Sequence, residues 1–227
     1  IVAVVLEPAG EVLLDRLPLV GQRGPPLDGP QQPGEFLGYF APCTAVHGLP
    51  VSFAVLPAEI DPRDPDSKPI KHTSLGRIKH EGATVVEAGD RVVVYTGDDE
   101  NGDYLYKFIG EGSWARHRKA GRSPLDHGTL HVAVFDANGG GTWVPLTHGT
   151  GALTTANGWA DQADVLIRTR QAADAVGATR LHRPEWVSVD SRTNDVYVTL
   201  TNGSGNNAPV NSNRDPNPYG HILRIRE

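Results

Sequence analysis

The sequence predicts an all-β protein, and more specifically part of a β-propeller, from three observations. Short runs rich in Val, Tyr, Thr and Ile recur along the chain and are separated by polar turns. Glycine and proline are abundant, with 26 and 18 copies in 227 residues, which favours many short elements over a few long helices. One strand–turn–strand pattern also occurs twice, so we expect about three to four propeller blades.

The expected strands begin after residue 50. Residues 1–50 are rich in Pro, Gly and Gln and show no hydrophobic period, which predicts an irregular extension before a propeller portion at residues 51–227. In chain order the strand-forming stretches are VSFAVLPAEID, ATVVEAGDRVVVYTGDD, DYLYKFIG, GTLHVAVFDANGGGTWVPL, EWVSVD, DVYVTLTN and GHILRIRE. Two of them contain a hairpin turn, at Ala88–Asp90 and at Asn138–Gly141.

A single inserted helix is expected near residues 160–177. Ala, Val, Leu and Ile recur there at helical spacing, and Gly177 suits a helix C-terminus. The strand that follows, from Trp186, has the apolar composition of a buried strand.

Composition excludes several classes of function. The net charge of −6 argues against a general affinity for nucleic acid or an anionic membrane. No run of apolar residues is long enough to span a bilayer. The single cysteine, Cys43, excludes an internal disulfide and a cysteine-rich zinc site. A chain that begins with Ile and contains no Met is expected to be a fragment or a processed form.

The internal repeat aligns the stretch from Glu81 with the stretch from Glu185. At a constant offset of 104, Val85 falls on Val189, Tyr95 on Thr199 and Asp98 on Asn202. This offset is longer than one propeller blade of about 40–50 residues and suits two blades, one of them carrying the inserted helix. Each copy has a Glu at the start of its first strand, so both carboxylates are expected to converge on a central channel.

Converging carboxylates repel each other and need a cation. Oxygen ligands of this kind suit Ca²⁺, Mg²⁺, Mn²⁺ or ferric iron, which makes Glu81 and Glu185 candidate metal ligands. The alternative is a local ion pair, of Glu81 with His80 or Lys79 and of Glu185 with Arg183.

Three further residues are candidates for the same site. Arg183 lies two positions before Glu185 and shares its face of the strand, so its guanidinium could hold a phosphate or carboxylate with two hydrogen bonds, or form a structural salt bridge. Asp98 and Asp99, in TGDDE at a strand end, could bind Ca²⁺ or lie in a solvated turn. The spacing of an EF-hand loop is absent.

Several long stretches resemble the PhoX-type bacterial alkaline phosphatases over about residues 56–227. They are EIDPRDPDSKPIKHTSLGRIKHEGATVV, VVVYTGDDENGDYLYKFI, RTRQAADAVGATRLHRPEWVSVD and NPYGHILRIRE. The resemblance implies a β-propeller enzyme that bacteria export to the periplasm or the medium, and that hydrolyses small phosphate monoesters with a cluster of Fe³⁺ and Ca²⁺. It also implies that Glu81 and Glu185 are metal ligands and that Arg183 is the catalytic and substrate-binding residue that contacts phosphate. Asp98 and Asp99 look like family positions too.

The sequence also departs from the family pattern. The upstream segment that supplies a cysteine ligand to iron is absent, and Cys43 does not stand in that context. His182 occupies a position where the family has Asp, and the expected export signal and further blades are missing. We therefore expect the chain alone to be marginally stable, with an incomplete metal cluster and impaired activity. Two alternatives are a non-catalytic calcium-binding propeller and a propeller lactonase.

Overall fold

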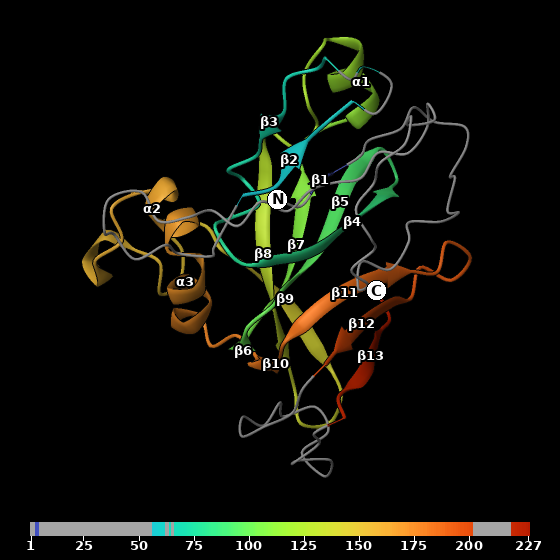
Figure 1. The fold of residues 1–227 in the computed structure, drawn as a ribbon. Helices are drawn as coiled ribbons and strands as arrows, with labels where there is room; N and C mark the ends of the chain where they lie inside the picture. The colour runs from blue at the N-terminus through green and yellow to red at the C-terminus, as the bar shows by residue number, and fades with distance from the viewer. Residues whose placement is uncertain (1–2, 5–55, 62–63, 65, 202–218) are drawn as a thin grey trace, which may run out of the picture. The chain divides into compact units, whose positions relative to one another are not determined.

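Two antiparallel sheets dominate the described part of the chain (Figure 1). The computed structural model describes residues 3–4, 56–61, 64, 66–201 and 219–227. Contacts group residues 1–6 and 52–227 into one unit and residues 7–51 into a second. The second unit, most of the predicted irregular extension and Cys43 lie outside the described residues.

The larger sheet has five strands in the order β4-β5-β7-β8-β9, each antiparallel to its neighbours. The strands are β4 (His80–Ala88), β5 (Arg91–Asp98), β7 (Leu105–Gly110), β8 (Gly128–Phe135) and β9 (Gly141–Pro145). The β4–β5 hairpin turns at Gly89, whose φ of +67° lies in the left-handed region that glycine adopts without steric cost. Four of the five strands fall within stretches that the sequence predicted as strands, and β4 begins three residues before its predicted stretch.

The second sheet has three antiparallel strands in the order β11-β12-β13. They are β11 (Pro184–Val189), β12 (Val196–Leu200) and β13 (His221–Ile225). Smaller ladders complete the described β structure: β1 (Ala3–Val4) with β2 (Ala58–Glu59) and β3 (Ile70–Lys71), and β6 (Asn101–Asp103) with β10 (Leu181–His182).

Strand β5 is buried on both faces. Val92 and Val94 belong to a core shared with the helices, while Val93 and Tyr95 belong to a second core shared with the three-stranded sheet. The continuous apolar run of β5 therefore reflects two successive layers of packing. The expected burial of the strand from Trp186 is only half correct, because β11 turns its neighbour Val187 into the second core and leaves Trp186 57% exposed.

The predicted single helix at 160–177 is two short helices, α2 (Gln162–Ile167) and α3 (Thr169–Ala175). The break at Arg168 has a tertiary cause: the backbone N–H of Arg77 donates to the Leu166 carbonyl at 2.9 Å, and its Nε donates to the Ile167 carbonyl at 3.2 Å. These contacts compete with continued helical hydrogen bonding.

Two further helical turns were not predicted, α1 (Trp114–Lys119) and the 3₁₀ turn η1 (Thr155–Asn157), because short polar helices leave no apolar period in a sequence. Within the described residues, no helix is long and apolar enough to cross a membrane.

The predicted repeat is present in strand order, since β4-β5-β7 and β11-β12-β13 are both antiparallel triplets. The first strands do align at an offset of 104, and both ladders shift register just after their start, between Glu81 and Thr84 and between Pro184 and Val187. These shifts are β-bulges, which bend a strand and redirect its side chains.

The offset is not constant, however, and that part of the prediction is wrong. Val85 pairs with Val94 whereas Val189 pairs with Val196, so the second strands align at an offset of 102. The register places Tyr95 on Tyr197 and Asp98 on Leu200. Between these paired valines the first hairpin encloses eight residues and the second encloses six, so positions after the turn align at the smaller offset. The described part of the fold is thus mostly β with few helices, and the number of propeller blades stays a prediction.

A glycine permits the close approach of β11 to β5. A Cβ atom built on Gly97 would lie 2.0 Å from the Pro184 carbonyl oxygen and 2.7 Å from the Glu185 carbonyl oxygen. Gly97 also pairs with Glu81 in the β4–β5 ladder. Alongside, the Thr84 hydroxyl donates to the Val187 carbonyl. The start of β11 is therefore held directly against the strand that carries Glu81.

We expect Gly97→Ala to lower the free energy of unfolding by about 2–3 kcal/mol, the upper part of the range for overpacking, because the clash is with backbone that cannot rotate away. Urea unfolding followed by circular dichroism measures this. Gly140→Ala is the control, since the atoms nearest to its methyl group would belong to the side chains of Asp136 and Asn138. A Gly97→Ala variant as stable as the wild type would contradict the close approach.

Candidate functional site

The structure brings Arg183, Asp99 and Glu185 together. The Arg183 guanidinium donates from Nε to Asp99 Oδ1 at 2.8 Å and from Nη2 to Asp99 Oδ2 at 3.1 Å, a two-bond grip. Its Nη2 also lies 3.2 Å from Glu185 Oε1. Glu185 accepts a further hydrogen bond from the Thr201 hydroxyl. The salt bridge that the sequence allowed between Glu185 and Arg183 is therefore present.

The backbone at Arg183 turns the chain from β10 into β11. Its φ of +46° is uncommon for a non-glycine residue, and the residue precedes Pro184, which restricts it further. The preceding residue is anchored, because His182 is buried and its Nδ1 lies 3.1 Å from Asn101 Oδ1. A strained residue held by such contacts is the arrangement often found at binding sites.

Glu81 lies beside this cluster without a partner of its own. Within the described residues its side chain makes no hydrogen bond or ion pair. Burial, followed by the charges of Asp99 and Glu185, raises the pKa of the Glu81 carboxyl, and Arg183 opposes that rise. Asp99 and Glu185 contact the Arg183 guanidinium and Glu81 does not, so three carboxylates face the charges of Arg183 and Lys79 and negative charge exceeds positive charge at this place.

The local ion pairs expected as an alternative for Glu81 are wrong. His80 is buried, with Nδ1 3.0 Å from the Thr96 hydroxyl and Nε2 donating to the Gly76 carbonyl at 2.9 Å. Burial lowers the pKa of His80 to about 4, so it is neutral near pH 7. Lys79 pairs instead with Glu100 at 3.0 Å.

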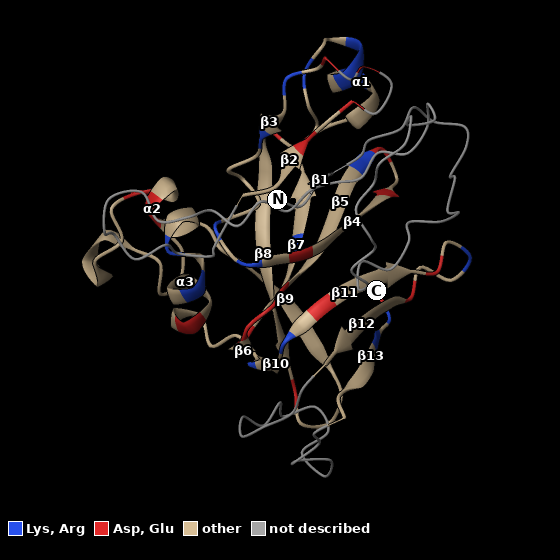
Figure 2. Ribbon diagram, in the orientation of Figure 1, with Lys and Arg blue, Asp and Glu red and all other residues tan. Residues whose placement is uncertain are grey.

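Figure 2 shows acidic residues on β4 and β11 and basic residues at the start of β11.

Asp98 points away from its neighbour Asp99. It is fully buried and accepts from Arg170 Nε at 2.7 Å, from Arg170 Nη2 at 2.5 Å and from the Lys79 backbone N–H at 3.0 Å. Arg170 Nε also lies 3.2 Å from Asp103 Oδ2. A ligand role for Asp98 stays a prediction, and here both of its carboxylate oxygens are already occupied.

The donor set of Glu81, Asp99 and Glu185 fits a hard cation in its chemistry, because all three are carboxylates and their repulsion is only partly offset. The described residues contain no group of three or more His, Cys, Asp or Glu side chains arranged to hold a metal ion. In this structure the positive charge next to Asp99 and Glu185 is the guanidinium of Arg183.

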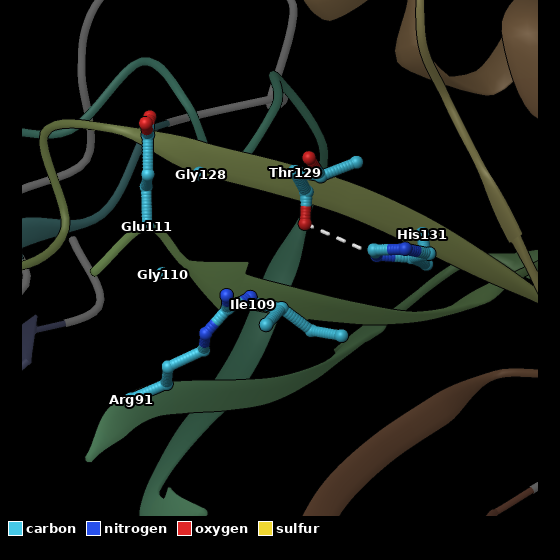
Figure 3. A pocket seen from close by; sticks show the side chains of 7 residues that line it. All are labelled: Arg91, Ile109, Gly110, Glu111, Gly128, Thr129 and His131. Atoms are coloured by element: carbon cyan, nitrogen blue, oxygen red, sulfur yellow. Dashed lines mark hydrogen bonds between the residues drawn. The ribbon is translucent and has the colours of Figure 1, made fainter. Parts of the chain in front are cut away.

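A separate pocket of about 290 Å³ opens at the other end of β5 (Figure 3). It is lined by Arg91, Ile109, Gly110, Glu111, Gly128, Thr129 and His131. The His131 ring donates from Nδ1 to the Thr129 carbonyl at 3.1 Å. Arg91 begins β5 and Asp98 ends it, so the pocket lies about 23 Å along the strand from the carboxylates.

Sequence reasoning missed two side chains that contact candidate acids, Arg170 on Asp98 and Thr201 on Glu185. Arg170 is one of several charged residues in a helical stretch, and Thr201 directly follows β12, two residues after Thr199. Neither position carries a signal in a single sequence, because both find their partners through tertiary packing.

Comparisons with known proteins agree on one family. A sequence model described as alkaline phosphatase PhoX matches residues 56–227. Among solved structures, Pseudomonas fluorescens PhoX in complex with vanadate, a transition state analogue, is similar with a TM-score of 0.68 and 48% sequence identity. The match covers 74% of this chain and 31% of that chain, so this chain spans about a third of that protein's length. No curated protein matches.

We expect Asp103→Asn to stabilise the chain by about 1 kcal/mol at pH 8. Burial, followed by the charge of Asp98, raises the pKa of Asp103 to about 6, above its value of about 4 in an unfolded chain. The folded state therefore loses stability as pH rises from about 4 through 6, and the substitution would remove that loss. The expected gain is small because the carboxylate is partly solvated.

Urea unfolding at pH 4, 6 and 8 tests this expectation. The stabilisation should grow with pH across that range and vanish at pH 4. Asp66→Asn, at an exposed position, controls for the substitution itself. A stabilisation that is equal at all three pH values would show that the charge of Asp103 is not its cause.

Proposed function

This chain belongs to the alkaline phosphatase PhoX family, and from that premise we propose that it contributes the phosphate-binding arginine and part of the metal site of an enzyme that hydrolyses phosphate monoesters. The observation that carries the proposal is the contact of Arg183 with Asp99 and Glu185 beside Glu81, which has no partner among the described residues. An arginine with two aligned donors suits the oxygens of a phosphate.

Glu81, Glu185 and Asp99 would hold the cations, for which we propose Ca²⁺ and Fe³⁺ from the resemblance. Bound cations would supply charge stabilisation for the phosphoryl oxygens and a more acidic bound water. The three carboxylates need not transfer a proton, because their role is to place positive charge next to Arg183. We propose no such role for Asp98, whose oxygens are taken by Arg170 and Lys79.

Arg183 would bind the phosphate by exchanging or sharing its carboxylate partners. Its Nε and Nη2 contact Asp99 and Glu185, and within the described residues its Nη1 makes no hydrogen bond. A cation held by the same carboxylates would weaken their pull on the guanidinium and make its donors available to phosphate oxygens. The positive charge of the Arg183 guanidinium would then offset the negative charge that develops on the phosphate oxygens in the transition state. No Ser or Thr nucleophile is proposed.

The wider architecture is also part of the proposal. Two antiparallel triplets that each begin with a site glutamate favour neighbouring blades of a β-propeller. The family further favours a place in the periplasm or outside the cell. The competing proposal is a non-catalytic calcium-binding propeller, favoured by the fact that the Arg183–Asp99 ion pair already joins the end of β5 to the start of β11.

Calcium should stabilise the chain through these carboxylates. At a calcium concentration about 100 times the dissociation constant we expect a gain of about 2.7 kcal/mol in the free energy of unfolding. Glu81→Gln should remove most of that gain, whereas Glu87→Gln, an exposed position on the same strand, should keep it. Thermal unfolding with and without Ca²⁺ measures both. Equal calcium effects in the two variants would remove Glu81 from the site.

Arg183→Lys should lower kcat/KM for an aryl phosphate by about 100-fold, because lysine cannot reproduce the two-bond grip. The control is Arg192→Gln in the β11–β12 turn, whose arginine pairs only with Asp190 among the described residues. Assays contain Ca²⁺ and Fe³⁺ and include a lactone in parallel. If the lactone is hydrolysed and the aryl phosphate is not, the protein is a lactonase and the phosphatase proposal is wrong. Calcium binding without either activity would favour the non-catalytic role.

A further inference from the structure

A second arginine lies behind the site. Arg170 projects from α3 and contacts both oxygens of Asp98, at 2.7 and 2.5 Å, from a helix 72 residues further along the chain. Asp98 is fully buried, and this guanidinium supplies its counter-charge. The pair touches neither Arg183 nor Glu185 within the described residues, which separates it from the contacts described above.

Asp98 fixes the two segments that carry site residues. Its Oδ1 accepts from the Lys79 backbone N–H at 3.0 Å, and the Asp99 backbone N–H donates back to the Lys79 carbonyl at 3.0 Å. Lys79 lies two residues before Glu81. The Lys79 backbone N–H is therefore bound by the Asp98 carboxylate, and the Asp99 backbone N–H is bound directly beside it. These two contacts fix the backbone that leads to Glu81 and to the Asp99 side chain.

Helix α3 is itself firmly placed. Ala172 and Ala173 are buried in the first core, and the Thr169 hydroxyl accepts from the Arg77 backbone N–H at 3.1 Å. Arg77 in turn lies two residues before Lys79. The segment leading into β4 is thus tied to the helices at one residue and to the end of β5 at another, with Arg170 joining the two attachments.

We propose that the Arg170–Asp98 ion pair is a positioning device that holds Glu81 and Asp99 in the arrangement that binds cation and phosphate, an inference that rests on the proposed function for its ligands. Arg170 touches neither ligand and acts through the backbone of Lys79 and Asp99. Without Arg170, the buried Asp98 carboxylate loses its counter-charge, and hydrating it requires the end of β5 to separate from the start of β4.

The test uses Arg170→Gln in the full chain with two readouts. The first is hydrogen exchange of the Lys79 and Asp99 backbone amides, which should become at least about tenfold faster while core amides such as that of Val94 are unchanged. The second is the dissociation constant for Ca²⁺, which should rise about 10- to 100-fold, as for other residues that orient metal ligands.

Three comparison variants sharpen the result. Arg170→Lys should partly restore calcium affinity. The double variant Asp98→Asn with Arg170→Gln removes both charges and keeps hydrogen-bonding groups. It is used in place of Arg170→Gln if Arg170→Gln alone does not fold. Arg192→Gln, which removes an exposed ion pair with Asp190, should behave as wild type.

Faster exchange at Lys79 and Asp99 together with weaker calcium binding supports the proposal. Calcium affinity that is unchanged while exchange increases would make the pair merely structural and overturn it, and unchanged exchange would overturn it as well. A wild-type chain that binds no calcium would instead refute the proposed function, while the exchange data would still decide whether Arg170 positions these two peptides.

Discussion

The site depends on the close packing of β11 against the ends of β4 and β5. At Gly97 the backbones approach so closely that a methyl group has no room, and the Thr84 hydroxyl bridges to β11 at the Val187 carbonyl. This contact places Glu185 beside the strand pair that carries Glu81, although 104 residues separate them. The charged cluster is therefore a consequence of backbone packing between two sheets, and its geometry is as rigid as that packing.

Packing of this kind has an electrostatic cost. Glu81, Asp99 and Glu185 meet at a partly buried place, where burial, followed by the charges of the other two carboxylates, raises the pKa of Glu81. Arg183 offsets the repulsion by pairing with Asp99, and Arg170 neutralises the neighbouring Asp98. In the proposed function, a bound cation would supply the positive charge that this cluster lacks.

The sequence was informative where structure is local. The valine-rich runs predicted strands because alternation and β-branching act within a few residues, and the glutamates at the start of the two first strands aligned correctly. Features set by distant contacts were missed. The helix breaks at Arg168 because Arg77, far away in the chain, donates hydrogen bonds to the carbonyls of the two preceding residues. The second hairpin encloses two residues fewer between its paired valines than the first, a difference that no strand pattern predicts.

The adjacent acids Asp98 and Asp99 show how a strand end sorts residues of the same type. Successive side chains of a strand point to opposite faces, so Asp98 enters the layer of the helices and meets Arg170, while Asp99 faces β11 and meets Arg183. In sequence the two are equivalent carboxylates. In the fold one is fully buried and holds backbone, and the other is partly exposed and holds the arginine proposed to bind phosphate. Their different roles follow from the alternation of the strand together with what packs on each face.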